Sequence, residues 1–313
     1  MNETFALRGL TFRNRVFVAS GTFGYGDEVS DVASLDLLGG IVTKSLSLRP
    51  RDGNPPPRIA ETSSGMLNSI GLANIGVERF VAEKLPKLDG RRCAVIANIA
   101  ASSVEEYCTV LEMLDPLSRV DGFEINVSCP NVKEGGLSFG TDVSKVSLIT
   151  KELRRRTRKP LIVKLTPNVT HIAEFARAAE GEGADAVSVI NTLIGMAINI
   201  YTRRPKLSTV TGGLSGPAIK PIALAKVFET YKAVKIPVFG IGGISTWEDA
   251  IEFLLAGASA VQVGTANFVD PAGAMKLPQE IVRFCESRSV RDVGDLVGGM
   301  KGEPGVSVIQ SWL

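Results

Sequence analysis

The stretch that decides the fold is Pro237-Val238-Phe239-Gly240-Ile241-Gly242-Gly243, a short apolar run that ends in two glycines. A second run, Ala260–Ala266, repeats the pattern and has Gly264 and Thr265 near its end. Such runs are too short for helices, and their continuous hydrophobicity is typical of parallel strands buried on both faces. Six earlier runs share these properties: Arg15–Ser20, Ile41–Leu46, Ala94–Ala100, Gly122–Ser128, Leu161–Thr166 and Ala186–Thr192.

Amphipathic stretches with a helical period lie between most of these runs. Eight strands that alternate with helices predict a (β/α)8 TIM barrel, and an open doubly wound sheet is the competing arrangement. The expected helices are Val104–Leu114, Val143–Arg156, His171–Glu182, Ile219–Ala233 and Thr246–Ala256.

Each run ends in, or just after, a polar residue or a glycine, which favours the barrel. The carboxyl ends of barrel strands converge on one rim, where enzymes of this fold keep their chemistry. Lys44 and Lys164 are costly at such positions unless an anion pairs with them. No Asp or Glu stands beside either lysine on its own strand, so we expect both to face a ligand anion. The strand-end residues are Ser20, Lys44, Asn98, Asn126, Lys164, Asn191, Gly242 and Gly264.

Bulk composition narrows the class of protein. The 313 residues are 44% apolar and have a net charge of +2, which is typical of a globular chain and gives no electrostatic footprint for nucleic acid or a membrane surface. No signal peptide or membrane span is expected, and the four cysteines form no CxxC pair, so we expect a cytoplasmic protein with no metal site. We expect a single domain, 1–313, with insertions at Ser47–Arg92, Cys129–Thr141 and Gly195–Pro217.

Two glycine sites stand at the ends of the last two runs. Gly242 and Gly243 follow the seventh run, and Gly264 and Thr265 follow the eighth. Glycine exposes backbone N–H groups, and the loops after strands seven and eight are the common phosphate cradle of these barrels. The pair of sites predicts a cofactor or substrate that bears a phosphate.

Cys129 is the candidate for acid–base chemistry. It follows the fourth run, precedes Pro130 and begins a glycine-rich loop, and a thiol needs only a modest pKa shift to act near neutral pH. The other three cysteines fit inert buried positions. The one histidine, His171, is expected at a helix start on the surface, which gives hydrolytic catalysis little support.

With these residues in place, the chain resembles the dihydroorotate dehydrogenases, and in particular the class 1B catalytic subunit. The likeness runs from about Leu7 to Asp270. Six motifs carry it: Ser20-Gly21-Thr22-Phe23-Gly24-Tyr25-Gly26, Met66-Leu67-Asn68-Ser69-Ile70-Gly71-Leu72, Asn126-Val127-Ser128-Cys129-Pro130-Asn131, Ile190-Asn191-Thr192-Leu193, Gly212-Gly213-Leu214-Ser215-Gly216-Pro217-Ala218 and Gly264-Thr265-Ala266-Asn267-Phe268.

The resemblance implies a flavin, FMN, at the rim and a pyrimidine stacked on it. The implied FMN partners are Ser20, Lys44, Ser45, Asn98, Asn126, Lys164, Ile190, Gly216, Gly242, Gly243, Gly264 and Thr265. The implied substrate partners are Lys44, Asn68, Ser69, Ile70, Gly71, Leu72, Asn126, Asn191 and Thr192. Asn side chains offer both a donor and an acceptor, which suits the amide edges of a pyrimidine.

The resemblance also implies a reaction, in which Cys129 takes the C5 proton of dihydroorotate while a hydride leaves C6 for FMN. Class 1B enzymes pass the electrons to a partner subunit that carries FAD and a [2Fe–2S] cluster, and then to NAD. A homodimer joined to that subunit as a heterotetramer is therefore expected.

Several alternatives stay open. Class 1A, a homodimer that reduces fumarate, fits the same residues. Other flavin barrels, such as tRNA dihydrouridine synthase or dihydropyrimidine dehydrogenase, should show a basic face or cysteine-rich segments, which this sequence lacks. A phosphate-binding barrel without redox chemistry is the alternative from another class.

Overall fold

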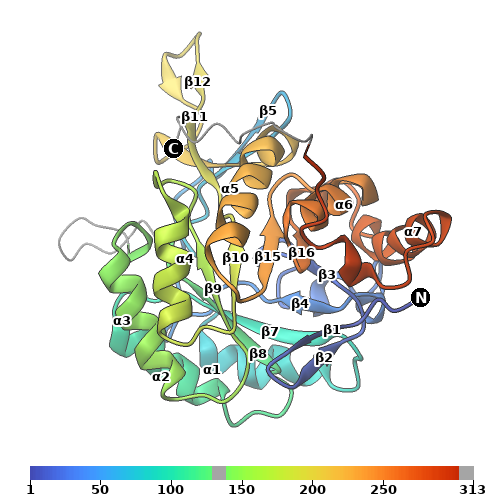
Figure 1. Ribbon diagram of the computed structural model, residues 1–313. Coiled ribbons are helices and arrows are strands. Elements are labelled where there is room, and N and C mark those ends of the chain that lie inside the picture. Colours follow the sequence, from blue (N-terminus) through green and yellow to red (C-terminus); the bar gives the residue numbers. More distant parts are fainter. Residues whose placement is uncertain (129–138, 303–313) are drawn as a thin grey trace.

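The computed structural model describes residues 1–128 and 139–302 of the chain (Figure 1). Eight parallel strands form a closed barrel in the order β10-β15-β16-β3-β4-β7-β8-β9, which confirms the predicted fold and excludes the open sheet. The strands lie inside the eight predicted runs or begin one residue outside them. Their bounds are β3 Val16–Val18, β4 Gly40–Val42, β7 Ala94–Ile99, β8 Gly122–Asn126, β9 Leu161–Leu165, β10 Ala186–Val189, β15 Val238–Ile241 and β16 Ala260–Val263.

Helices surround the barrel and pack their apolar faces against its strands (Figure 1). The predicted helices are confirmed to within about two residues at each end. Thr246 begins α6 with a capping box, since its hydroxyl accepts from the Asp249 N–H while the Asp249 carboxylate accepts from the Thr246 N–H. The bounds are α1 Val77–Arg79, α2 Val104–Leu114, α3 Val143–Arg154, α4 Ile172–Gly181, α5 Lys220–Ala233, α6 Trp247–Ala256 and α7 Gly273–Ser287.

Short 3-10 turns complete the helical structure, together with one π-helical turn, η3 Phe80–Lys84. The 3-10 turns are η1 Asp27–Val29, η2 Leu35–Leu37, η4 Leu85–Leu88, η5 Phe139–Thr141, η6 Pro217–Ile219, η7 Thr265–Phe268 and η8 Val293–Leu296. Within the described ranges, no helix is both long and apolar enough to cross a membrane.

An N-terminal hairpin closes the amino end of the barrel. Strands β1 (Phe5–Leu7) and β2 (Leu10–Phe12) pair antiparallel, and the rings of Phe5 and Phe12 stack with centroids 5.6 Å apart. Phe12 meets Phe17 edge to face at 5.0 Å, and Phe17 meets Phe239 at 5.2 Å. Because these rings are buried together, they fill the amino end, and the opposite rim remains as the place for a site.

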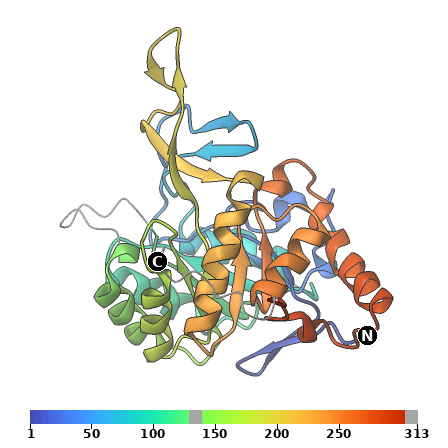
Figure 2. The same cartoon turned by 45° about the horizontal axis from the view of Figure 1, so that its top comes forward.

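Two insertions combine into an arm that projects from the barrel (Figure 2). Strands β5 (Ile59–Thr62) and β6 (Gly65–Asn68) come from the first insertion, and β11 (Leu193–Met196) and β14 (Thr211–Ser215) from the third. They form one antiparallel sheet in the order β11-β14-β6-β5. A two-residue ladder, β12 (Ile198–Asn199) with β13 (Arg204–Pro205), extends the arm outward. These two insertions therefore carry structure of their own.

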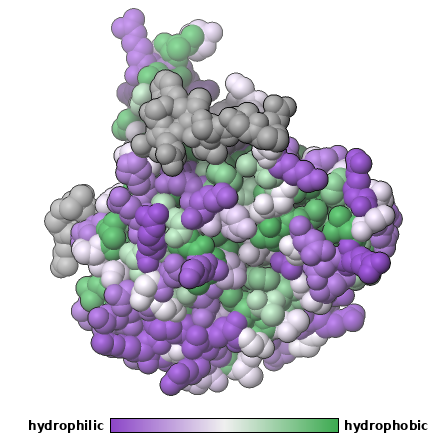
Figure 3. All heavy atoms as spheres, viewed as in Figure 1, coloured by the Kyte–Doolittle hydropathy of each residue, from purple (hydrophilic) through white to green (hydrophobic). Residues whose placement is uncertain are grey.

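The projecting arm exposes apolar side chains. Figure 3 shows apolar atoms on it beside polar ones. Ile200 and Tyr201 near its tip are 74% and 91% exposed, and Ile194 in β11 is 71% exposed. Exposed apolar groups clustered in this way are typical of a contact surface.

Candidate active site

The predicted strand-end residues lie together at the carboxyl rim of the barrel. Asn126 pairs with Lys164 in the β8–β9 register, so the two side chains leave neighbouring strands at the same level. Ser45, which follows β4, donates from Oγ to Asn98 Oδ1 of β7 across 2.6 Å. The strand order thus brings residues that are far apart in sequence to one rim.

Asn126 is the centre of a group of amides. Its Oδ1 accepts from Asn191 Nδ2 at 3.3 Å and from the Ser128 backbone N–H at 3.2 Å. Its backbone carbonyl accepts from the hydroxyl of Tyr107, a fully buried residue of α2, at 2.7 Å. Asn191 in turn accepts from the Thr192 N–H with its own Oδ1 at 2.8 Å. The amides predicted to bind a pyrimidine are therefore fixed in position.

Asn68 joins this group through the arm. Its Nδ2 donates to the backbone carbonyl of Gly213 at 3.3 Å, and β6 pairs with β14 at these two residues. A Cβ added to Gly213 would overlap the Thr192 hydroxyl, so Gly213 and Thr192 are in close contact. Asn68 and Thr192 thus both contact Gly213, which brings two of the predicted substrate residues near each other.

Residues 69–72 form a loop that the rest of the arm holds in place. The Ser69 hydroxyl accepts from Asn54 Nδ2 at 2.8 Å and from the Thr209 hydroxyl at 2.6 Å. Gly71 and Leu72 have φ of +72° and +56°, in the left-handed region. The backbone N–H and carbonyl of Ser69 and the carbonyl of Ile70 are also hydrogen-bonded within the arm. Among the described residues, no hydrogen bond uses the N–H groups of Ile70, Gly71 or Leu72, so these are the donors that the loop offers a ligand.

The glycine loops fit a phosphate. Gly243, with φ +78°, lies so close to Gly216 that an added Cβ would come within 2.9 Å of the Gly216 carbonyl. Within the part of the chain that the structure describes, no hydrogen bond uses the backbone N–H groups of Gly243, Gly264 or Thr265. Thr265 Oγ1 donates to Ser215 Oγ at 2.8 Å, which ties this rim to β14. Free N–H groups from adjacent strand ends match the donors that a phosphate needs.

Lys44 is half-buried at the rim. Burial lowers its pKa from that of an ordinary lysine, whereas the nearby Glu28 carboxylate raises it and the Arg58 guanidinium lowers it further. No ion pair or side-chain hydrogen bond of its ammonium is found among residues 1–128 and 139–302. Its ammonium therefore has no hydrogen-bonded counterion in that part of the chain, and its role toward a ligand anion stays a prediction.

Lys164 differs, because a carboxylate from another strand lies beside it; that it also faces a ligand anion stays a prediction. Its ammonium lies 3.6 Å from Oε1 of Glu124, a fully buried residue of the neighbouring strand β8. The expectation that no core carboxylate neutralises Lys164 considered only its own strand. In a parallel barrel the partner of an inward-pointing side chain comes from the adjacent strand.

The proposed base, Cys129, lies outside the described residues. Its neighbour Ser128 is anchored to Asn126, as described above. The other cysteines are free and buried, and burial raises the pKa of all three thiols, to about 11 for Cys93. Thiols of this kind stay protonated near neutral pH, as expected of inert residues. His171 is exposed at the start of α4, also as expected.

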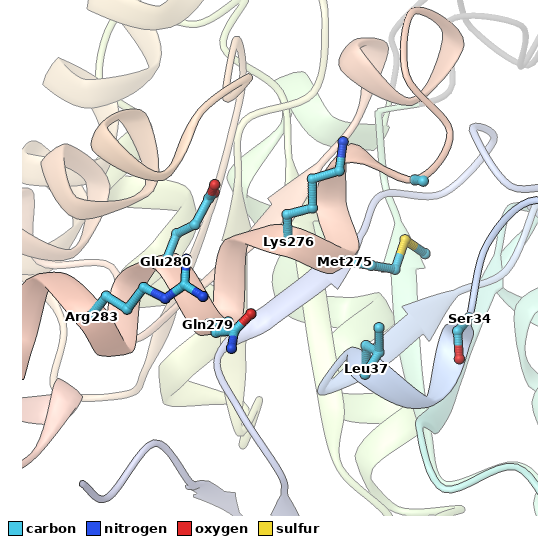
Figure 4. A pocket seen from close by; sticks show the side chains of 8 residues that line it. Ser34, Leu37, Met275, Lys276, Gln279, Glu280 and Arg283 are labelled. Carbon is cyan, nitrogen blue, oxygen red and sulfur yellow. The ribbon is translucent and has the colours of Figure 1, made fainter.

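Concave regions on the outer helices do not contain the predicted site. Figure 4 shows a depression of about 420 Å³ between α7 and η2, lined by Leu37, Met275 and Arg283 among others. A second depression of about 470 Å³ lies between α2 and α3. Neither includes a strand-end residue, so we place the site at the rim on the contacts described above.

Sequence reasoning missed the residues that support the site from inside. Glu124, Ser188 and Gln262 are fully buried in the middle of apolar strands, and Glu124 accepts from the other two. Asn168 was also missed; its Nδ2 donates to the Thr192 carbonyl at 3.0 Å. The sequence signal for Glu124, Ser188 and Gln262 was a polar residue inside an apolar run.

Comparisons with known proteins identify the family. The family model for dihydroorotate dehydrogenase matches residues 4–285. A curated relative from Geotalea uraniireducens (strain Rf4), named dihydroorotate dehydrogenase B (NAD(+)), catalytic subunit, is 53% identical over 292 residues, which cover 93% of this chain and 96% of the relative. A relative of the same name from Pelobacter propionicus is 52% identical and covers 95% of this chain and 98% of its own.

A solved structure has the same fold. The dihydroorotate dehydrogenase of Eimeria tenella in complex with ferulenol superposes with a TM-score of 0.78 at 23% identity, over 95% of this chain and 88% of that one. The rim geometry, the family model and the long, highly identical relatives lead to one conclusion: this chain belongs to the dihydroorotate dehydrogenase family.

Proposed function

We propose that this chain oxidises (S)-dihydroorotate to orotate in de novo pyrimidine biosynthesis. The observation that carries the proposal is the meeting of the Asn126 and Asn191 amides with Lys164 and the two glycine loops at one rim. The shared name of the curated relatives supports the same reaction.

The family is flavin-dependent, and we infer that the flavin here is FMN. The residues fit it, because free backbone donors stand where its phosphate would lie and cationic and amide groups stand beside its ring. Gly216, Gly242, Gly243, Gly264 and Thr265 would hold the phosphate. Ser20, Lys44, Ser45, Asn98, Asn126, Lys164 and Ile190 would hold the ring system. When bound, FMN supplies the acceptor for the hydride that leaves C6 of dihydroorotate.

The remaining chemistry belongs to the chain. The Lys44 ammonium faces the carboxylate of dihydroorotate, and Asn68, Asn126, Asn191 and Thr192, with the loop 69–72, hold its amide edges. Cys129 accepts the C5 proton. The Ser128 N–H bond to Asn126 supports this role, because it anchors the chain beside the base at the amide group.

We further propose how the electrons leave. They pass to a partner subunit with FAD and a [2Fe–2S] cluster, and then to NAD, in a heterotetramer built on a homodimer of this chain. The relatives' name, with its NAD(+) and "catalytic subunit", supports the NAD-linked type. The exposed apolar side chains of the arm favour a protein–protein contact. Free buried thiols favour the cytoplasm, and we treat 1–313 as one domain.

Flavin spectroscopy tests the reaction. We expect purified protein to be yellow and its flavin absorbance to bleach when dihydroorotate is added without oxygen. Colourless protein with no affinity for FMN would refute the proposal and favour a phosphate-binding barrel without redox chemistry.

An acceptor screen tests the class. The chain alone is assayed with fumarate, NAD and a quinone, and then with a co-purified iron–sulfur flavoprotein. Activity with NAD that requires the second subunit supports the NAD-linked type. Fumarate reduction by the chain alone would assign it to class 1A.

A further inference from the structure

One buried carboxylate lies at the centre of the barrel. Glu124 is in the middle of β8 and fully buried. It accepts from Asn98 Nδ2 of β7 at 2.7 Å, from Ser188 Oγ of β10 at 2.8 Å and from Gln262 Nε2 of β16 at 2.8 Å. In the closed order, β16 stands opposite β8. The carboxylate therefore spans the barrel interior, and each of these partners is a donor.

The two oxygens of Glu124 have different partners. Oε2 accepts from Ser188 and Gln262, while Oε1 accepts from Asn98 and faces Lys164 Nζ at 3.6 Å. That distance is longer than a hydrogen bond, so the ammonium is held as an ion pair and keeps its N–H donors for another acceptor. Within the described ranges this ion pair is the contact found for the Lys164 ammonium. A buried ammonium without such a counterion would be costly.

Both residues on the Oε1 side belong to the candidate flavin site. Asn98 stands opposite Glu124 in the β7–β8 register, and its Oδ1 accepts from Ser45 on the other side. Lys164 stands opposite Asn126 in the β8–β9 register. Glu124 is therefore one contact away from the proposed flavin, on the interior side of the rim.

We propose that Glu124 is a positioning residue for the flavin: its carboxylate aims the Lys164 ammonium and the Asn98 amide at the ring, and it partly offsets the positive charge that the ring experiences. This inference rests on the proposed flavin chemistry. It assigns Glu124 no contact with flavin or substrate, and it makes the flavin potential, as well as the stability of the barrel, depend on a group inside the barrel.

Replacing Glu124 by Gln separates charge from shape. The amide has nearly the same size, but one of its two ends becomes a donor. The new NH₂ can donate to the Ser188 hydroxyl or to the Gln262 amide once it turns, because Gln262 Oε1 has no partner among the described residues. The main change is therefore the loss of the negative charge. The positive charge of Lys164 is no longer offset, so the negative charge that a flavin gains on reduction is favoured.

The experiment is a double-mutant cycle on the flavin-loaded chain. The midpoint potential and the FMN dissociation constant are measured for wild type, Glu124→Gln, Lys164→Gln and the double variant, and urea unfolding is measured without flavin. We expect Glu124→Gln to make the potential more positive and to weaken FMN binding about tenfold, the effect of one charge-assisted hydrogen bond. We expect Lys164→Gln to make the potential more negative, and Glu124→Gln to shift it little in that background.

Asp185 supplies a matched control. It is also a mostly buried carboxylate with ion pairs, to Arg8 at 3.0 Å and Arg154 at 2.7 Å, but it precedes β10 at the amino end of the barrel. We expect Asp185→Asn to lower stability without moving the potential or the affinity for FMN.

Three results would overturn the inference. One is a Glu124→Gln shift of equal size with and without Lys164. Another is a loss of stability with unchanged potential and affinity, which would make Glu124 merely structural. If Glu124→Gln does not fold, Glu124→Asp replaces it in the test. Aspartate keeps the charge but is shorter, so we expect a wild-type potential with weaker FMN binding. Unchanged FMN binding in Glu124→Asp is the third result that would overturn the inference. Wild-type protein that fails to bind FMN refutes the proposed function instead.

Discussion

Asn191 Nδ2 donates to Asn126 Oδ1 across 3.3 Å, although the two residues are 65 positions apart and lie at the ends of strands that are not neighbours. Strand β9 separates β8 from β10 in the barrel, so the two side chains meet above its end. The contact shows that amides from strands two places apart meet at the rim. A flat polar ring placed there would meet amides from more than one strand.

Cys129→Ser should retain FMN but lose about 10²-fold or more of its turnover near neutral pH. A serine hydroxyl is a far poorer base than a thiolate, and general base catalysis contributes on this scale. Activity should recover as the pH rises. Steady-state turnover against pH, with flavin content measured from the absorbance spectrum, checks this prediction. Wild-type turnover of the variant at pH 7 would exclude Cys129 as the base.

Gly213→Ala should raise the KM for dihydroorotate about tenfold or more, because the new methyl group would overlap the Thr192 hydroxyl and displace it. FMN affinity should stay close to wild type, since Gly213 faces the substrate side. Gly181→Ala is the matched control: it lies at the end of α4, and nothing stands within 4 Å of an added Cβ. Equal KM values for the two variants would place Thr192 outside the substrate site.

The pH dependence of substrate binding should follow Lys44. Its pKa lies below that of an ordinary lysine because it is partly buried, so it loses its charge at a lower pH than usual. Since the charged form binds the anion, kcat/KM should fall on the alkaline side as this group titrates. The negative charge of Glu28 raises the pKa of Lys44, so Glu28→Gln should move the fall in kcat/KM to lower pH.

Lys44→Arg is the control for that titration. An arginine stays charged through the same pH range. The alkaline fall in kcat/KM should therefore be absent from the Lys44→Arg variant, even if its kcat/KM is lower at every pH. The measurement is a kcat/KM profile of wild type, Glu28→Gln and Lys44→Arg. An unchanged fall in Lys44→Arg would assign the titration to another group.

Cys93 should make the protein less stable at alkaline pH. Burial raises the pKa of its thiol to about 11 from an ordinary value near 9, so between these values the unfolded chain loses a proton that the folded chain keeps. The free energy of unfolding should therefore fall as the pH rises from 9 to 11, by roughly 2 kcal/mol. Urea unfolding at pH 8 and pH 10.5 should show a smaller fall in Cys93→Ala. An equal fall in both proteins would contradict the assignment.

Much of the fold could be predicted because its signals are local. The helix Val104–Leu114 has the predicted bounds, since Ser103 caps its first turn and its apolar face follows the helical period. The eight strands were predictable for a similar reason. Parallel strands covered on both faces need continuous apolar runs, and turn residues end each run.

The arm and the interior charges depend on long-range pairing, which local patterns do not show. Strand β14 contains Gly212 and Gly213 and has little strand propensity of its own; it forms because β6, some 145 residues earlier at Asn68, pairs with it. The partner of Lys164 was missed for the same reason. Glu124 stands on a different strand, and the closed register makes them neighbours.

A cluster of aromatic rings closes the amino end of the barrel and affects the electrostatics of its interior. The rings are those of Phe5, Phe12, Phe17 and Phe239. Rings that cover one end of the barrel keep bulk water away from the pair below the opposite rim. Any molecule that occupies the mouth then encloses Glu124 and Lys164 between two surfaces of lower dielectric constant than water, and the Coulomb attraction of that pair increases as water leaves. Binding of a ligand at the carboxyl rim should therefore also stabilise the barrel strands that carry Glu124 and Lys164.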